Sequence, residues 1–175
     1  MTNEQKIVQY LAEARASELA LVRVLQSQLT MTPDGPYRDA LEDHLAETRS
    51  HAQRISVRLR ELGWAENPLL GVLGVAEVAA GQVIALAKTP LDLLRGTSVA
   101  EKVLKNAKDT CATEALEIAT YTALHHLAET SGDVRTSSLA ADIRADELHM
   151  LDRVRTLLPG LTDEVASDDR SLAAA

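Results

Sequence analysis

The chain has few aromatic residues and one cysteine, and both shortages narrow the kinds of protein that it can be. Its 175 residues include no Phe, one Trp and three Tyr, so a core must be built from Leu, Val, Ile and Ala, which suits closely packed helices. The lone Cys111 excludes an internal disulfide framework. No sustained run of alternating β-branched and aromatic residues predicts a strand. We therefore predict an all-α protein.

Basic residues and common catalytic motifs are also scarce. The sequence has 18 Lys and Arg against 26 Asp and Glu, a net charge of −8, whereas phosphate binding requires clustered Lys and Arg. Nucleic acid is therefore not an expected partner. There is no Gly-rich phosphate loop, no Gly-x-Ser-x-Gly and no Cys-x-x-Cys. Residues 2–6 are polar, so we expect no secretory signal and a cytoplasmic protein.

Turn and capping signals predict four long helices, arranged as two antiparallel hairpins over residues 3–63 and 98–158. The boundaries rest on Thr2, Ser98 and Asp133 as N-caps, Pro33-Asp34-Gly35-Pro36 as a turn, and Gly63, Gly132 and Pro159-Gly160 as stops. Four long helices with one long connection have the topology of a ferritin-like bundle. We predict one such domain over residues 1–160 and a disordered tail over 161–175.

The connection between the hairpins, residues 66–97, is predicted to be an apolar helical crossover. Residues 69–87 approach the length of about 20 apolar residues that a membrane span needs. Glu77, Gln82 and three glycines interrupt that run. We therefore favour a packed crossover or a subunit interface over membrane contact, and we expect a homodimer.

Carboxylates occupy positions where an apolar helix stripe should continue. One stripe reads Ile7, Leu11, Ala14, Glu18, Leu21 and Leu25, and the other reads Val103, Ala107, Thr110, Glu114, Glu117, Tyr121 and Leu124. Steps of three and four keep each set on one helical face. A buried carboxylate without a partner costs several kcal/mol, so these groups need compensation, and a pair of metal ions is the leading candidate.

The second and fourth helices add acid–histidine pairs to these carboxylates. Glu47 and His51 are four residues apart, and Asp146 and His149 are three apart. Glu18 to Glu47 spans 29 residues and Glu117 to Glu147 spans 30, which suggests two half-sites related by a pseudo-two-fold axis.

Two iron or manganese ions need about four carboxylates and one or two imidazoles. The predicted metal ligands are Glu18, Glu47, His51, Glu114, Glu117, Glu147 and His149. Whether His44, Asp146 or Glu77 joins them is left open. Tyr121, one turn from Glu117, is a candidate redox-active residue or hydrogen-bond donor to a ligand.

At these positions the sequence resembles the ferritin-like superfamily, in particular the bacterial stress-induced ferritin-like group of unassigned function. The resemblance covers about residues 7–158. It is carried by His44-Leu-Ala-Glu47-Thr48 with His51, Glu114-Ala-Leu-Glu117-Ile-Ala-Thr-Tyr121, Asp146-Glu147 and Gly74-Val-Ala-Glu77. It implies a bundle with a di-iron or similar centre and a role in stress or in iron and oxygen handling, without a defined reaction.

The chain departs from the usual Glu-x-x-His pair of di-iron bundles. The spacing from Glu47 to His51 is one residue longer, and Asp146 is shorter than the usual Glu. Two functions therefore stay open. One is a di-metal oxidoreductase that reacts with dioxygen or peroxide. The other is a non-catalytic helical-bundle stress or adaptor protein with a vestigial metal site.

Overall fold

The computed structural model describes residues 1–64 and 98–173, and within these ranges the chain forms four helices and no strand. They are α1 (Asn3–Leu29), α2 (Pro36–Glu61), α4 (Val99–Thr130) and α5 (Val134–Ala173). The predicted all-α bundle of two helix hairpins is confirmed. The predicted crossover over 66–97, including Glu77, lies outside the described residues.

Local capping explains where the helices begin and end. Thr2 Oγ1 accepts the Gln5 N–H at 3.2 Å and Gln5 Oε1 accepts the Thr2 N–H at 2.9 Å, which completes the predicted capping box. Ser98 Oγ accepts the Glu101 N–H at 3.2 Å at the start of α4. Gly63 and Gly132 follow α2 and α4 with φ of 76°, a left-handed conformation that suits glycine.

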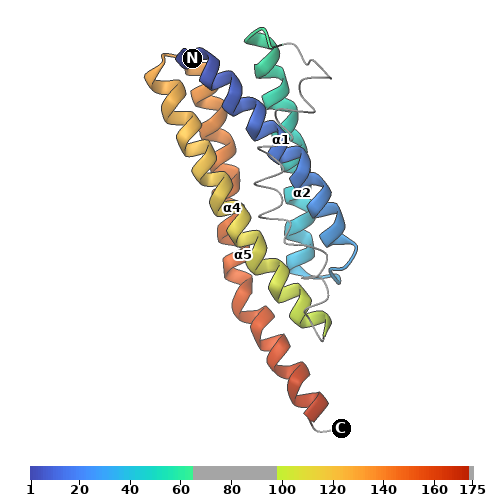
Figure 1. Cartoon of the computed structure of the whole chain (residues 1–175). Coiled ribbons are helices and arrows are strands. Elements are labelled where there is room, and N and C mark those ends of the chain that lie inside the picture. Colours follow the sequence, from blue (N-terminus) through green and yellow to red (C-terminus); the bar gives the residue numbers. More distant parts are fainter. Residues whose placement is uncertain (65–97, 174–175) are drawn as a thin grey trace.

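Each helix packs against two neighbours around the bundle. α1 and α5 both contact α2 and α4, so α1 lies diagonally opposite α5 (Figure 1). The amino-terminal half of α1 meets the carboxyl-terminal halves of α2 and α4, as Leu11, Ile55 and Leu124 share one cluster. Neighbouring helices therefore run antiparallel.

Two apolar clusters fill the ends of the bundle, and a layer of polar side chains lies between them. One cluster includes Ile7, Leu11, Ile55, Leu59, Tyr121, Leu124 and Ile143, and the other includes Leu21, Leu25, Leu41, Val103, Met150 and Val154. The polar layer lies between the two clusters, at positions where polar residues interrupt the buried faces of the helices. Its buried members are Glu18, His44, Thr48, His51, Thr110, Glu114, Glu117 and Glu147.

The last helix is longer than the sequence predicts. The predicted stop at Pro159-Gly160 does not end α5, which continues to Ala173 and projects beyond the other helices in Figure 1. An internal proline costs about 3 kcal/mol because it removes a hydrogen bond and its ring meets the preceding turn. The helix continues here because leucines on both sides of Pro159 pack against the apolar cluster that includes Leu21 and Val154. These leucines are Leu157, Leu158 and Leu161. Residues 161–173 thus form the last part of α5.

None of the helices within residues 1–64 and 98–173 combines the length with the apolar character needed to cross a bilayer.

Candidate metal centre

All four helices contribute acidic or imidazole side chains to the polar layer. Glu18 comes from α1, His44 and His51 from α2, Glu114 and Glu117 from α4, and Glu147 from α5. None of these side chains belongs to a residue that is more than 4% exposed. They are buried because each occupies a core position of its helix, where an apolar residue would otherwise stand.

Donor atoms of these residues converge in two overlapping groups. His44, Glu114, Glu117 and Glu147 form one group, and Glu18, His51 and Glu147 form the other. Within each group, one ligand atom per residue lies within 4.8 Å of all the others. Glu147 belongs to both groups, so it lies where a carboxylate could bridge two positions. These groups could hold a metal ion.

The facing atoms of the histidines and glutamates in this layer are close but do not form hydrogen bonds with one another. His51 Nδ1 lies 3.0 Å from Glu147 Oε1 and 3.6 Å from Glu18 Oε1. His44 Nε2 lies 3.3 Å from Glu114 Oε1. Within this layer, the buried side-chain atoms without a hydrogen-bond partner are Glu18 Oε2, His44 Nε2, His51 Nδ1, Glu117 Oε2 and both carboxylate oxygens of Glu114 and Glu147. Buried polar atoms are normally paired, so this set fits a metal ion.

The outward nitrogens of both histidines do meet partners. His44 Nδ1 lies 3.4 Å from Glu47 Oε2, and His51 Nε2 lies 3.1 Å from Asp146 Oδ2. The side chains of Glu47 and Asp146 are 39% and 43% exposed, so both carboxylates stand at the rim of the layer.

Two hydroxyl groups orient the buried carboxylates. The Tyr121 hydroxyl donates a hydrogen bond to Glu18 Oε1. The Ser17 hydroxyl donates to Glu117 Oε1 at 3.3 Å. Tyr121 is itself buried and lies where the first apolar cluster meets the polar layer. Its position matches the predicted role of a hydrogen-bond donor to a candidate ligand.

Burial makes the carboxyl groups of Glu18, Glu117 and Glu147 hard to ionise. Loss of hydration raises the pKa of Glu18, raises that of Glu117 well above its usual value, and raises that of Glu147 to about 7. For Glu117, the negative charges of Glu18 and Glu147 add to the effect of burial. In the absence of a cation, these groups therefore favour retaining protons.

The neighbouring carboxylates raise the pKa values of both buried histidines. Burial by itself lowers the pKa of His44, but interactions with Glu114 and Glu47 outweigh it and raise the pKa to about 11. Burial likewise opposes protonation of His51, while Glu147 and Glu18 raise its pKa to about 10. Without a metal, both imidazoles are positively charged at neutral pH, and a bound metal must displace their protons.

Five of the seven predicted ligands lie together in the structure. They are Glu18, His51, Glu114, Glu117 and Glu147. The structure adds His44, which the sequence left open. A signal for His44 was available, since Leu41, His44, Thr48 and His51 follow one another at steps of three and four along the buried stripe of α2.

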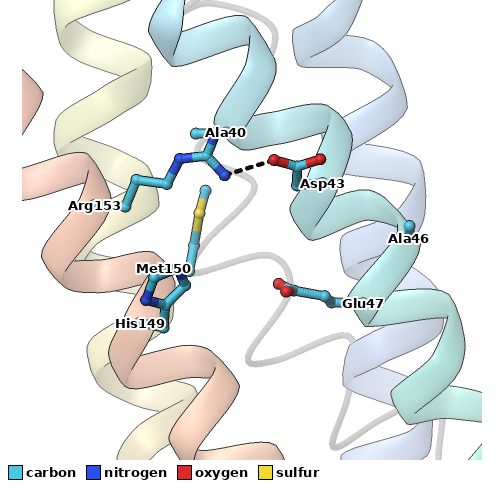
Figure 2. A pocket seen from close by; sticks show the side chains of 7 residues that line it. All are labelled: Ala40, Asp43, Ala46, Glu47, His149, Met150 and Arg153. Carbon is cyan, nitrogen blue, oxygen red and sulfur yellow. Dashed lines mark hydrogen bonds and ion pairs between the residues drawn. The ribbon is translucent and has the colours of Figure 1, made fainter.

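The other two predicted ligands, Glu47 and His149, lie outside both groups. They line a surface pocket between α2 and α5, beside an ion pair of 2.7 Å between Arg153 and Asp43 (Figure 2). His149 follows Glu147 by two residues, which turns it about 200° around the helix and leaves it exposed. The two half-sites that the spacing predicts therefore differ, since Glu147 is buried and Glu47 is half-exposed.

The fold and the site define a four-helix bundle with a buried histidine–glutamate cluster that could hold a metal ion. Residues 3–167 match the family described as Domain of unknown function (DUF892), and the chain belongs to that family. None of the curated proteins compared with the chain matches it.

Several solved structures share the fold. The E. coli stress protein YciF is 20% identical, with a TM-score of 0.77 over 93% of this chain and 98% of that one. Protein XCC3681 from Xanthomonas campestris pv. campestris is 18% identical, with a TM-score of 0.74 over 97% and 99%. YcfI from Rhodopseudomonas palustris is 18% identical, with a TM-score of 0.73 over 89% and 94%. At these identities the likeness concerns the fold alone.

Proposed function

We propose that this protein is a ferritin-like di-metal carboxylate protein that binds two iron or manganese ions and reacts with dioxygen or peroxide. The observation that carries the proposal is the pair of buried groups that share Glu147 and whose facing atoms lack hydrogen-bond partners. A stress role draws support from the name of the E. coli stress protein, whose fold is similar.

The charge of the polar layer also supports two divalent ions. Four buried carboxylates, those of Glu18, Glu114, Glu117 and Glu147, face two imidazoles. Even with both imidazoles protonated, ionisation of all four carboxylates would leave negative charge in the core, which is costly. Two divalent cations would balance four carboxylates while both imidazoles bind as neutral ligands.

Each residue has a distinct part in the proposed centre. Glu147 would bridge the two ions, with Glu18 and His51 completing one position and His44, Glu114 and Glu117 the other. Such ions, when bound, supply electrons to an oxidant. The Tyr121 hydroxyl orients Glu18 by its hydrogen bond, and the surrounding apolar clusters exclude bulk water.

Metal content after loading tests this proposal. The purified protein is exposed anaerobically to iron(II) or manganese(II), desalted, and analysed by inductively coupled plasma mass spectrometry. We expect close to two ions per chain in the wild type. Glu147→Gln should lose both positions or bind both weakly, because it removes the shared charge. Glu129→Gln, an exposed change on α4, serves as the control and should bind as the wild type does.

Turnover decides whether the centre is catalytic. Loaded wild-type protein should consume peroxide or dioxygen faster than free metal at the same concentration, and Glu147→Gln should not. Substoichiometric metal that is unaffected by Glu147→Gln would overturn the proposal. It would instead favour a non-catalytic helical-bundle stress or adaptor protein with a vestigial site.

A further inference from the structure

The two buried histidines of α2 are oriented in opposite ways. His44 faces the centre with Nε2 and meets Glu47 through Nδ1. His51 faces the centre with Nδ1 and meets Asp146 through Nε2. In each ring, the outward nitrogen is hydrogen-bonded to a rim carboxylate, whereas the inward nitrogen faces a buried candidate ligand, Glu114 or Glu147, without a hydrogen bond.

We propose that Glu47 and Asp146 are positioning residues that determine which ring nitrogen each histidine presents to a metal, Nε2 for His44 and Nδ1 for His51. This inference rests on the proposed function and deepens it. It gives Glu47 a different role from the ligand role that its spacing to His51 suggests. It also makes Asp146 part of the centre without direct contact with the ions.

The chemistry of the imidazole ring supports this assignment. A neutral imidazole carries one N–H donor and one nitrogen lone pair, and an ionised carboxylate can only accept. A carboxylate beside the outward nitrogen therefore keeps the proton there and leaves the lone pair pointing inward. Such partners commonly fix the orientation of metal-binding histidines and make the ring a stronger ligand.

The carboxylate partners of the two histidines, Glu47 and Asp146, come from different helices. Glu47 lies three residues after His44 on the same helix. Asp146 comes from α5 and directly precedes Glu147, which belongs to both candidate metal groups. Adjacent helical residues point about 100° apart, so α5 places Glu147 inside the layer and Asp146 at its rim. His51 is thus held between two carboxylates of one helix.

Half-exposure of both rim carboxylates makes the inference testable. The side chains of Glu47 and Asp146 are 39% and 43% exposed. Replacing either with its amide therefore buries no uncompensated charge, and the variants should fold. Glu42 on α2 and Asp142 on α5 give matched controls, since their side chains are 51% and 64% exposed and each pairs with an arginine rather than with a histidine.

Zinc(II) is a suitable probe because it is diamagnetic and has no redox chemistry. Zinc stoichiometry and affinity are measured by competition with a chelator in the wild type, Glu47→Gln, Asp146→Asn, Glu42→Gln and Asp142→Asn. We expect unchanged stoichiometry throughout and affinity about 10- to 100-fold weaker in the two rim variants alone. In loaded wild-type protein, nitrogen-15 spectra should show zinc on Nε2 of His44 and on Nδ1 of His51.

Other outcomes would overturn the inference. Loss of a whole zinc equivalent would make the altered residue a ligand, and wild-type affinity would make it an ordinary surface group. A wild type that binds no zinc would count against the proposed function instead. The positioning role would then be judged in metal-free protein, where the His51 Nε2–H should exchange slowly with water and Asp146→Asn should speed that exchange. Unchanged exchange would refute it.

Discussion

The metal-free protein should lose stability steeply between about pH 7.5 and pH 9.5. The folded state raises the pKa of His44 to about 11 and that of His51 to about 10, whereas an unfolded histidine titrates near 6.5. A raised histidine pKa gives stability that is complete below the unfolded value and is lost as pH rises towards the folded value. In this window His44 and His51 hold two protons in the folded state that they lack in the unfolded state. These two histidines should make the free energy of unfolding fall by about 2.7 kcal/mol per pH unit, and a proton that Glu117 retains adds to this slope.

Urea unfolding followed by circular dichroism measures this slope. Chelator-treated protein is compared with manganese-loaded protein at several pH values across the window. The loaded protein should show a much shallower slope, because bound metal replaces the histidine protons in the folded state. His51→Gln should make the metal-free slope shallower by about 1.4 kcal/mol per pH unit, and His126→Gln, which alters an exposed histidine, should leave it unchanged. A metal-free stability that does not change with pH would refute the reasoning.

Metal binding near pH 7.5 should release at least two protons, from His44 and His51, measurable by calorimetry in buffers of different ionisation enthalpy; no release would contradict their raised pKa values. Tyr121→Phe should lower stability by about 1–3 kcal/mol, because a buried Glu18 oxygen loses its donor, while metal stoichiometry stays unchanged. Glu18→Leu should remove metal from its group, as metal analysis would show, and should not stabilise the metal-free protein, because the buried Tyr121 hydroxyl loses its acceptor; retained metal would argue against the ligand role. His149→Ala should leave metal content and affinity unchanged, since a drop would make this exposed residue a ligand.

The sequence was sufficient to predict where α1 and α4 begin and which carboxylates of these two helices are buried. Capping signals at Thr2 and Ser98 are local, so they predicted helix starts without knowledge of the fold. Glu18, Glu114 and Glu117 interrupt apolar stripes whose period fixes the buried face, and all three are buried in the structure. Helical periodicity thus determined which acids face the core.

Tertiary structure alone decided which of the acid and histidine residues of α2 and α5 meet. His44, Glu47 and His51 all lie near one face of α2, and only packing against α4 and α5 distinguishes the buried imidazoles from the rim carboxylate. Asp146 contacts His51 although the two residues are 95 positions apart in the sequence, so no local spacing predicts this contact. α5 likewise continues past Pro159, where leucines on both sides pack against the second apolar cluster. Local sequence fixes the rotation of side chains about a single helix axis, but the contacts of the centre depend on how four axes are placed together.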